Sequence, residues 1–518
     1  MIGVKMLQRL QVTNPMDDIL DLQSDFLSSK SKDDRKLLGQ FFTGAIVSEY
    51  MASLVVKPKS KNVRILDAGA GTGILTASTA LHCLSIGCNS VHAVLFELDG
   101  DAIENLKRTL QIVQNLFIQH KASFTYEIRC EDFVLSRPDK ETKLQPFDIS
   151  VINPPYFKYS VKESPYARVV ADLYRGDPNI YASFMAIVMA CLKAHGQMIV
   201  ISPRSFTNGL YFKGFRAYLL AQSALDLIHI FKYRDKVFKK GDLSVLQENI
   251  ICKFIKGYET STVTIRSSNC DASINNADEQ EYPVDLIIDQ SNDQRLIRIP
   301  ESRYEASILR QAECFSTTFE GAGYFISTGP VVEHRTREYI TSETGLKNTV
   351  PLYRPHNVTA LTCQWNGLNK KDVSFKLDEG HKKHTLKNAT YVLLKRFSSK
   401  DEKRRLYSGV HLVDASDCEY IGFGNKTNYI GVSGEQLPIE EAYGLAAIFN
   451  SSFMDRYFRC ISGNTQVNAT EIRVLKFPSR EQVKAIGKKA IKLKSSNAID
   501  MDSIVNPVLG VKELVKGE

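Results

Sequence analysis

Residues 63–73, Val-Arg-Ile-Leu-Asp-Ala-Gly-Ala-Gly-Thr-Gly, decide the fold of this chain. The first four residues form a short apolar strand that ends at Asp67. The glycines at alternate positions then permit a tight turn, and they let the backbone approach a ligand that a side chain would exclude. The apolar stretch Ile74–Leu84 follows directly and predicts a helix. A strand, a glycine-rich turn and a helix in this order are typical of a ligand-binding α/β sheet.

The first half of the chain continues this alternation of strands and helices. Val91–Phe96 is expected to be a strand with Ala102–Gln114 as its helix, and Ile149–Ile152 is expected to be another strand. The apolar helix Tyr181–Leu192 and the strand Met198–Ile201 follow. This alternation predicts the α/β class, with a doubly wound, mainly parallel, Rossmann-like sheet that binds ligands at the carboxyl ends of its strands.

Length and composition predict two domains. A chain of 518 residues is too long for one hydrophobic core, and 43% hydrophobic with 24% charged residues is an ordinary globular balance that excludes wholesale disorder. The polar stretch from Thr260 to Asp293 predicts a surface excursion or an interdomain linker. We therefore expect one domain over residues 1–300 and a second, mixed α/β domain over residues 301–518, in which basic residues gather.

Net charge, cysteine spacing and hydropathy indicate the kind of partner and the cellular compartment of the protein. A net charge of +8 fits a polyanionic partner. The ten cysteines are scattered singly without a Cys-x-x-Cys pair, which argues against structural zinc and disulfides, so we expect no metal site and reduced thiols in a cytoplasmic protein. No run of about 18 apolar residues occurs, so neither export nor membrane insertion is expected.

Acids at the ends of successive strands predict a cofactor site. A dinucleotide fingerprint would place its third glycine at position 74, which is Ile74 here, so Asp67 and its glycine turn better suit a nucleoside with a cationic amino-acid tail. Glu97 can accept both ribose hydroxyls, although an acid at this place also serves enzymes that bind NAD. Asp132 and Phe133 offer an acceptor for an adenine amino group and an aromatic face for its ring. Taken singly, these features could be a structural turn and a core aromatic, but their succession favours a cofactor site.

Asn153-Pro154-Pro155-Tyr156 follows the strand Ile149–Ile152 and predicts the catalytic site. The N6 amino group of adenine is a poor nucleophile because its lone pair is delocalised into the ring. The Asn153 side-chain oxygen and the Pro154 carbonyl can accept its two hydrogens and stabilise the charge that develops when the nitrogen attacks a sulfonium methyl group. Tyr156 can stack on the base. Alone, these four residues could form a plain tight turn.

A target amino group buried in a duplex requires that the adenine be flipped into this site. A flipped base needs a second aromatic platform opposite Tyr156. We expect Phe206, which follows the strand Met198–Ile201, to provide it.

In the order of these motifs, the chain resembles the gamma group of amino-methyltransferases of bacterial restriction–modification systems, the TaqI-like enzymes. The resemblance spans most of the chain, with sharp motifs between Gly39 and Phe215. It implies S-adenosylmethionine as the cofactor and N6 of adenine in double-stranded DNA as the target. The residues that match the cofactor motifs of the family are Asp67, Gly69, Gly71, Gly73, Glu97, Asp132 and Phe133.

Gly39-Gln40-Phe41-Phe42-Thr43 looks like the N-terminal motif of this family, which contacts the methionine end of the cofactor. The resemblance implies that Thr43 caps a helix starting near Ala45 and points backbone donors at the cofactor carboxylate. Gly44 stands where the family usually has proline, which makes the start of this helix less rigid.

The C-terminal half resembles a DNA target recognition domain. Residues 449–452 and 463–468, with an expected strand Arg473–Phe477, are similar to the closing segment of such domains. Basic side chains of a recognition domain contact phosphates, and polar side chains read base edges. The candidates for phosphate contacts, which could also form a solvated loop without a partner, are Lys395, Arg396, Arg404 and Arg405.

The sequence thus predicts a site-specific DNA N6-adenine methyltransferase, a cytoplasmic monomer that is the modification partner of a restriction endonuclease encoded nearby. One alternative is methylation of another amino or amide nitrogen: N4 of cytosine, an RNA adenine or a protein glutamine. Enzymes for N4-cytosine more often carry serine in place of Asn153, and the glutamine enzymes are much shorter chains. The other alternative is an inactive DNA-binding protein that keeps the fold, against which the intact cofactor and catalytic motifs argue.

Overall fold

A computed structural model of the chain describes residues 15–29, 43–159, 164–176, 179–232, 248–290, 293–377, 382–398, 402–463, 465–493 and 500–511. The chain divides into two compact units, Met1–Arg298 and Ile299–Glu518, and each unit is described by itself. Residues 39–42 of the expected N-terminal motif lie outside the described residues.

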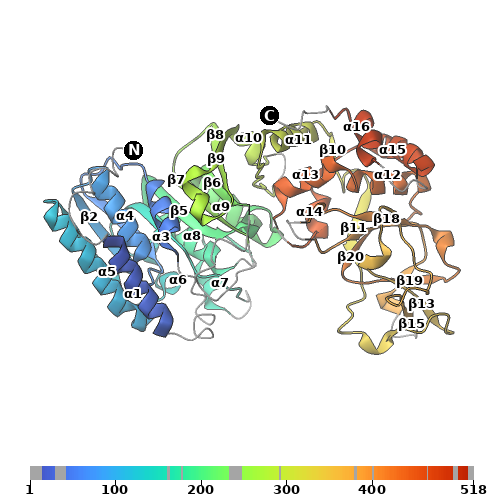
Figure 1. The fold of residues 1–518 in the computed structure, drawn as a ribbon, viewed down its shortest axis with the longest axis horizontal. Helices are drawn as coiled ribbons and strands as arrows, with labels where there is room; N and C mark the ends of the chain where they lie inside the picture. The colour runs from blue at the N-terminus through green and yellow to red at the C-terminus, as the bar shows by residue number, and fades with distance from the viewer. Residues whose placement is uncertain are drawn as a thin grey trace. The chain divides into compact units, whose positions relative to one another are not determined.

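The first unit is built on a nine-stranded sheet with the strand order β3-β2-β1-β4-β5-β7-β6-β8-β9 (Figure 1). The strands from β3 to β5 run parallel, and β7 lies antiparallel between β5 and β6. The chain order reverses between β1 and β4, so the carboxyl ends of these two strands border the place where such sheets bind ligands. The predicted doubly wound, mainly parallel sheet is confirmed. Its strands are β1 Val63–Ala68, β2 Ser90–Phe96, β3 Ser123–Arg129, β4 Phe147–Ile152, β5 Leu192–Pro203, β6 Ser223–Phe231, β7 Asn249–Lys256, β8 Thr262–Ser268 and β9 Asp278–Pro283.

Helices cover both faces of this sheet because successive side chains of a buried strand point to opposite sides. Val63 and Ile65 of β1 share a core with residues of α1, α3, α4 and α5. The opposite face packs against α8, which also contacts α6 and α9 (Figure 1). The helices of the unit are α1 Pro15–Ser29, α3 Ala45–Ser53, α4 Ile74–Ser85, α5 Gly100–Gln119, α6 Phe133–Ser136, α7 Pro165–Val169, α8 Ile180–Cys191, α9 Lys213–Gln222 and α10 Val284–Ile287.

The elements around the predicted motifs lie where the sequence indicates, with shifted ends. Helix α5 begins two residues before the expected Ala102, because Asp99 caps it by accepting a hydrogen bond from the backbone of Asp101. Helix α8 ends at Cys191, and β5 starts at Leu192 rather than at Met198. Leu192 pairs with β4, which draws the chain into the sheet earlier than the apolar pattern suggests.

The stretch from Thr260 to Asp293 is neither an excursion nor a linker, and this prediction was wrong. It forms β8, β9 and α10, and the two strands extend the sheet beyond β6. Strand β9 has only Tyr282 buried among its six residues. An edge strand that is exposed in this way has the composition of a loop, which explains the error.

The second unit combines helices with three small sheets, as expected for a mixed α/β domain. Its two five-stranded sheets have the orders β11-β20-β17-β18-β14 and β12-β15-β13-β19-β16, and β10 pairs with β21. The expected strand Arg473–Phe477 is shorter, because Arg473 is the last residue of α14 and only Lys476 and Phe477 form β21. The strands are β10 Thr317–Thr318, β11 Tyr324–Thr328, β12 Ile340–Thr341, β13 Thr349–Tyr353, β14 Leu361–Thr362, β15 Val373–Lys376, β16 Leu386–Lys387, β17 Tyr391–Lys395, β18 Ser408–His411, β19 Tyr420–Phe423, β20 Thr427–Val432 and β21 Lys476–Phe477. The helices are α11 Arg303–Glu313, α12 Ile439–Phe449, α13 Ser452–Ile461, α14 Ala469–Arg473, α15 Arg480–Leu493 and α16 Met501–Leu509.

All ten cysteines lie in the described part of the chain, and none forms a disulfide. Five of them are buried, whereas Cys130 and Cys314 are exposed. Within the described ranges, no helix is both long and apolar enough to cross a membrane.

Candidate functional site

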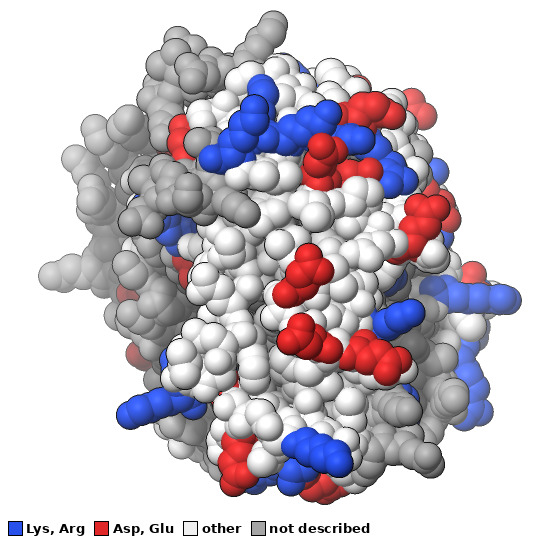
Figure 2. Space-filling model, turned by 90° about the vertical axis from the view of Figure 1, so that its right-hand side faces the viewer, with Lys and Arg blue, Asp and Glu red and all other residues white. Residues whose placement is uncertain are grey.

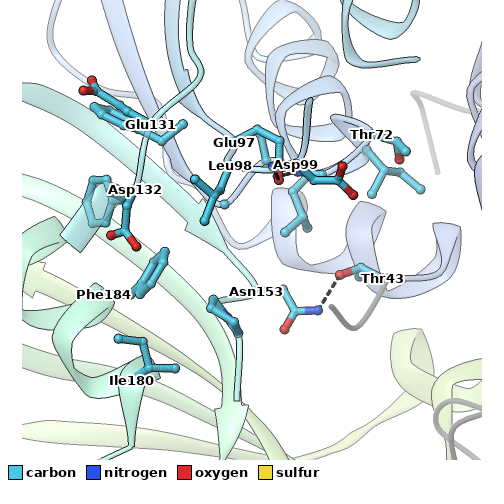
Figure 3. A pocket seen from close by; sticks show the side chains of 18 of the residues that line it. Thr43, Thr72, Glu97, Leu98, Asp99, Glu131, Asp132, Asn153, Ile180 and Phe184 are labelled. Atoms are coloured by element: carbon cyan, nitrogen blue, oxygen red, sulfur yellow. Dashed lines mark hydrogen bonds between the residues drawn. The ribbon is translucent and has the colours of Figure 1, made fainter. Parts of the chain in front are cut away.

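A pocket opens in the first unit at the carboxyl ends of β1 to β4 (Figure 3). Its wall is made by the glycine turn after β1, residues 96–99 after β2, residues 131–133 after β3, and Asn153 with Pro155 after β4. Helices complete it with Gln23 of α1, Tyr166 of α7 and Phe184 of α8. Among the described residues, no three histidine, cysteine, aspartate or glutamate side chains form a group that could hold a metal ion.

The glycine turn splits into a part that lines the pocket and a part that does not. Gly69 and Gly71 line it, both with a positive φ, of 88° and 56°. Gly73 lies outside the lining, where a β-carbon would come within 2.6 Å of Leu106 in α5. The third glycine therefore permits close packing of α4 on α5, which differs from the cofactor contact expected for it.

Asp67 lies beneath the pocket rather than in its lining. It is buried, and its Oδ2 accepts a hydrogen bond from the Thr76 hydroxyl at 2.6 Å. Its Oδ1 is buried without a hydrogen-bond partner in the described part of the chain. Burial raises the pKa of the Asp67 carboxyl from 3.8 to about 7, and the nearby Glu97 adds to this rise.

Asp67 gives a prediction for the pH dependence of stability. Because its pKa is higher in the folded than in the unfolded chain, the protonated form favours folding. The stabilisation is fully present below about pH 4 and is lost as the pH rises through about 7. We expect Asp67→Asn, which stays neutral, to flatten the fall in the melting temperature between pH 5 and pH 8, measured without cofactor by scanning calorimetry. An Asp67→Asn protein with the same pH slope as the wild type would show that other groups cause it; Asp101→Asn, at an exposed position, is the control.

Two backbone amides, one of them in the glycine turn, hold the Glu97 carboxylate in place. Its Oε2 accepts from the amide of Gly71 at 2.6 Å, and its Oε1 accepts from the amide of Asp99 at 2.8 Å. Burial raises its pKa, and these two hydrogen bonds oppose the rise. A carboxylate has about four acceptor positions, so two bonds that fix its plane still leave capacity for hydroxyl donors in the pocket.

Asp132 and Phe133, the pair predicted to bind the adenine of a nucleoside, both line the pocket. Asp132 Oδ1 caps α6 by accepting from two backbone amides, and its Oδ2 accepts from the Tyr166 hydroxyl at 2.7 Å. Burial and this contact raise the pKa of Tyr166 to about 12, so Tyr166 is a neutral donor. An amino group that approached Asp132 Oδ2 would have to share this oxygen with the Tyr166 hydroxyl.

Phe184 lines the pocket, although nothing in the sequence indicated a role for it in the site. Its ring lies 5.2 Å from that of Phe133, at an interplanar angle of 34°. A β-carbon on Gly69 would lie 3.6 Å from this ring, so the turn and the ring face each other closely. Helix α8 is apolar on all sides, and its periodicity therefore gives no sign of which residue faces the pocket.

Asn153 projects into the pocket from the end of β4 (Figure 3), and both ends of its side-chain amide form hydrogen bonds. Its Nδ2 donates to the Thr43 hydroxyl oxygen at 3.1 Å, and its Oδ1 accepts from the Tyr156 hydroxyl at 2.7 Å. The Tyr156 hydroxyl also lies 3.0 Å from the carbonyl of Ile201 in β5. Pro154 is buried, and burial raises the pKa of Tyr156, which keeps this phenol neutral.

Thr43 lies in the pocket, but it does not cap the helix as the resemblance implied. Helix α3 begins at Ala45 as expected, yet its N-cap residue is Gly44 and no side chain caps it. The Thr43 hydroxyl is 110 residues away in sequence from its partner, Asn153. The capping prediction for Thr43 was wrong.

Phe206 is not available as a stacking platform. It is fully buried, and its ring meets that of Phe215 edge-on at 6.1 Å. Its carbonyl accepts from the buried guanidinium of Arg216, which fixes this stretch in the core. The predicted place of Phe206 opposite Tyr156 is therefore wrong for this structure.

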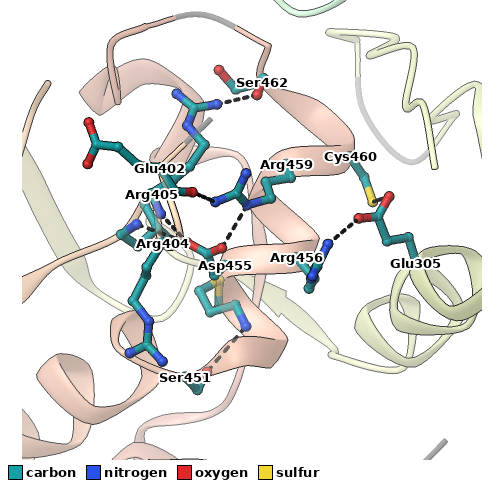
Figure 4. Close-up of polar contacts among 12 residues, drawn as sticks. Glu305, Glu402, Arg404, Arg405, Ser451, Asp455, Arg456, Arg459, Cys460 and Ser462 are labelled. Atoms are coloured by element: carbon teal, nitrogen blue, oxygen red, sulfur yellow. Dashed lines mark hydrogen bonds and ion pairs between the residues drawn. The ribbon is translucent and has the colours of Figure 1, made fainter. Parts of the chain in front are cut away.

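Arg405 of the second unit is fully buried, which contradicts its predicted role as a phosphate contact (Figure 4). Its guanidinium donates to the Ser462 carbonyl and lies 5.0 Å from the centre of the Phe458 ring. The backbone amides of Arg405 and Leu406 donate to Asp455 Oδ1 at 2.6 and 3.0 Å. A guanidinium enclosed in this way holds the fold together and cannot reach a phosphate.

Arg396 and Arg404 also form hydrogen bonds within the second unit. Arg404 donates to the carbonyl of Asn450. Arg396 donates to the carbonyl of Asn425 at 3.0 Å and to the side chain of Gln466 at 3.1 Å. Both arginines are half-buried, so each keeps some exposed surface.

Lys395 is half-buried with its ammonium 5.1 Å from the centre of the Tyr407 ring, and burial lowers its pKa.

Figure 2 shows one face of the molecule, on which lysine and arginine side chains gather in a band with acidic side chains among them. Further acidic side chains lie near the middle of the same face. That face is therefore of mixed charge.

The fold and the pocket together define the class of the protein. The strand order, the antiparallel strand β7 between β5 and β6, and a pocket at the ends of β1 to β4 are those of a Rossmann-like methyltransferase fold. A solved structure of the type IIL restriction-modification enzyme MmeI in complex with DNA matches 96% of this chain and 74% of that one, with a TM-score of 0.56 and 12% identity. At this identity the similarity concerns the fold alone.

The sequence comparisons place the chain in a family. Residues 78–238 match the family described as Eco57I restriction-modification methylase. The chain is 33% identical over 480 residues to the type II methyltransferase M.PstI of Providencia stuartii, an alignment that covers 92% of this chain and 93% of that protein. It is 34% identical over 478 residues to the type II methyltransferase M.BsuBI of Bacillus subtilis, covering 91% and 94%. The chain belongs to the type II methyltransferase family of restriction–modification systems.

Proposed function

We propose that this protein is a site-specific DNA methyltransferase that transfers the methyl group of S-adenosylmethionine to N6 of an adenine flipped out of the double helix. We further propose that it is the modification enzyme of a restriction–modification system, with a cognate endonuclease, and that it acts as a monomer in the cytoplasm. The observation that carries the proposal is that Asn153 shares one pocket with Glu97 and Asp132. Acceptors for a nucleoside and an amide for a target amino group are thereby combined in one site.

The residues of the pocket fit S-adenosylmethionine. Glu97 and Asp132 supply carboxylates for its hydroxyl and amino donors, and the rings of Phe133 and Phe184 supply an apolar face for its adenine. Asp67 is buried with an unpartnered oxygen among the described residues, and a cationic ligand nearby would favour the ionised form of its carboxyl. Because Asp67 does not line the pocket, its carboxylate would act on the ligand through its electric field rather than by direct contact.

The chemistry at the target nitrogen follows from Asn153 and Pro154. When bound, S-adenosylmethionine supplies an activated methyl group. Asn153 Oδ1 and the Pro154 carbonyl accept the two hydrogens of the adenine amino group, which withdraws the nitrogen lone pair from the ring and aims it at the methyl carbon. The same two acceptors stabilise the positive charge that develops on the nitrogen, so no residue removes a proton before the attack, and the methylated amino group loses one proton to solvent afterwards. Tyr156 holds Asn153 Oδ1 by a hydrogen bond and offers its ring to the base.

DNA as the substrate is supported by the family and by the size of the second unit, Ile299–Glu518. We propose that this unit is the target recognition domain, with Lys395, Arg396 and Arg404 as phosphate contacts. An alignment that covers more than nine-tenths of M.PstI favours DNA over a protein glutamine as the target. Asn153 in place of serine favours adenine over N4 of cytosine.

The test is expression of the protein in a host that lacks DNA methylation, followed by sequencing that detects modified bases. We expect N6-methyladenine at one recognition sequence. Methylcytosine in its place would overturn the target base, and unmodified DNA with methylated RNA or protein would overturn DNA as the substrate. DNA that is bound by the purified protein but left unmodified would support the inactive DNA-binding alternative.

Phe184 gives a prediction for cofactor affinity. We expect Phe184→Ala to raise the Kd for S-adenosylmethionine by roughly 10- to 100-fold, because the loss of one aromatic face costs about 1–3 kcal/mol of stacking. Isothermal titration calorimetry measures this effect. Phe397→Ala, which removes an exposed ring of the second unit, is the control and should leave the Kd unchanged. An unchanged Kd for Phe184→Ala would place the cofactor ring elsewhere.

A further inference from the structure

A chain of hydrogen bonds joins the glycine turn to the catalytic amide. The Thr72 hydroxyl donates to Gln23 Oε1 at 3.2 Å, and the Gln23 amide donates to the Thr43 carbonyl at 3.1 Å. The Thr43 hydroxyl oxygen then accepts from Asn153 Nδ2 at 3.1 Å (Figure 3). Gln23, Thr43 and Thr72 are buried, so water competes little with these bonds. Helix α1, the glycine turn and the end of β4 are thereby linked at the pocket.

The orientation of the Asn153 amide decides whether this residue can act. Adenine N6 carries hydrogens, so the amide has to present its oxygen, whereas a half-turn about the last side-chain bond would present an NH₂ group that repels them. Tyr156 by itself permits both orientations. Its single proton can go to Asn153 Oδ1 or to the Ile201 carbonyl 3.0 Å away, and in the second case the phenol oxygen can accept from the turned amide.

We propose that Thr43 is a positioning residue that holds the Asn153 amide in the orientation required for methyl transfer. Its hydroxyl oxygen accepts from Nδ2, which leaves Oδ1 directed toward Tyr156 and the base. A threonine hydroxyl can accept and donate at the same time, so its acceptor role toward Nδ2 leaves its own proton available to another group. The Gln23 bond to its carbonyl fixes the backbone from which the hydroxyl projects.

This role differs from the one implied by the position of Thr43 in the N-terminal motif, which concerned the cofactor alone. It predicts a loss in the rate of the chemical step, whereas a purely cofactor-binding role predicts a loss of cofactor affinity. The inference rests on the proposed function, since the amide needs its orientation only if it accepts hydrogens from the target amino group.

The test compares Thr43→Val, which keeps the shape and removes the hydroxyl, with Thr43→Ser, which restores the hydroxyl. With the full chain, saturating S-adenosylmethionine and a duplex that contains the recognition sequence, we expect Thr43→Val to lower the single-turnover rate by about 10- to 100-fold. The Kd for S-adenosylmethionine, measured by calorimetry, should change much less than the rate. Thr43→Ser should recover most of the lost rate. Thr79→Val, a buried threonine of α4 that bonds only its own helix backbone among the described contacts, is the matched control.

A double variant with Tyr156→Phe separates positioning from a general loss of structure. If both hydroxyls hold the same amide, Thr43→Val combined with Tyr156→Phe should be little slower than the slower single variant, because the second change acts on an amide already released. Losses that multiply would overturn the proposal, as would an equally slow Thr43→Ser or a Thr43→Val whose Kd rises as much as its rate falls.

Two further outcomes are informative. If Thr43→Val melts far below the wild type, Thr43→Ala with the same serine comparison replaces it, and failure of serine to recover the rate again overturns the proposal. If the wild type methylates adenine and Thr43→Val is equally fast, only the positioning role fails. If the wild type methylates no adenine in DNA, the proposed function itself fails, whatever the variants do.

Discussion

Replacement of Asn153 by alanine is expected to lower the rate of methyl transfer to DNA by about 10²–10³-fold, because in the proposed mechanism it removes one of the two acceptors for the charge that develops on the target nitrogen. Cofactor affinity should change little, since Glu97, Asp132 and the glycine turn, to which the proposal assigns the cofactor contacts, are unchanged in this variant. Single-turnover methylation of duplex DNA measures the first quantity, and calorimetry with S-adenosylmethionine measures the second.

The matched control is Asn89→Ala, which removes an exposed asparagine side chain of the same unit. The result would contradict the catalytic role if Asn153→Ala lost cofactor binding and thermal stability together with activity. Asn153 would then be a structural residue that links Thr43 to Tyr156. A rate within a few-fold of the wild type would place the target acceptors elsewhere.

Asp455→Ala is expected to lower the free energy of unfolding of the second unit by roughly 3–5 kcal/mol, the range for removing one partner of a buried charged contact. Asp455 is buried and accepts from the backbone amides of Arg405 and Leu406 through one oxygen (Figure 4). Its other oxygen accepts from Arg459 Nε at 2.8 Å. Alanine would leave two buried amides and a guanidinium without these bonds, each at a cost. Urea unfolding followed by circular dichroism measures the loss.

Asp417→Ala, at an exposed position of the same unit, is the control and should change the stability by less than about 0.5 kcal/mol. Cofactor binding by the first unit should survive the Asp455 change. The structural role of this cluster would be refuted by an Asp455→Ala protein of wild-type stability with impaired DNA binding, because the charges would then serve the partner rather than the fold.

The sequence was sufficient to predict the features that follow from strand ends. In a parallel sheet the carboxyl ends meet at one edge, so Glu97, Asp132 and Asn153 could be assigned to one pocket although they lie far apart in the chain. The fold class rests on the same local pattern of strand, turn and helix. The predicted helix and strand ends differ from the observed ones by a few residues, where a cap or a strand pair outweighs the apolar pattern.

Properties that depend on tertiary packing could not be predicted in the same way. Arg405 and Arg404 are neighbours in a basic run, yet one is fully buried and the other half-buried, and nothing in the composition distinguishes them. Phe206 has the residue type of a stacking platform, but a ring is available only if the core leaves it uncovered. Gln23 reaches the pocket from α1, a helix that carries no motif, and no sequence signal connects it to Thr43.

Strand β9 closes one edge of the nine-stranded sheet. Exposed edges of sheets invite a second molecule to add a strand, and proteins discourage this with charges and prolines. Three of the exposed side chains of β9 are the acids Asp278, Glu279 and Glu281, and the strand ends at Pro283, which has no backbone donor to offer. The same polar residues that make β9 resemble a linker in the sequence therefore disfavour edge-to-edge aggregation. Removal of this segment would expose the backbone hydrogen-bonding groups of β8.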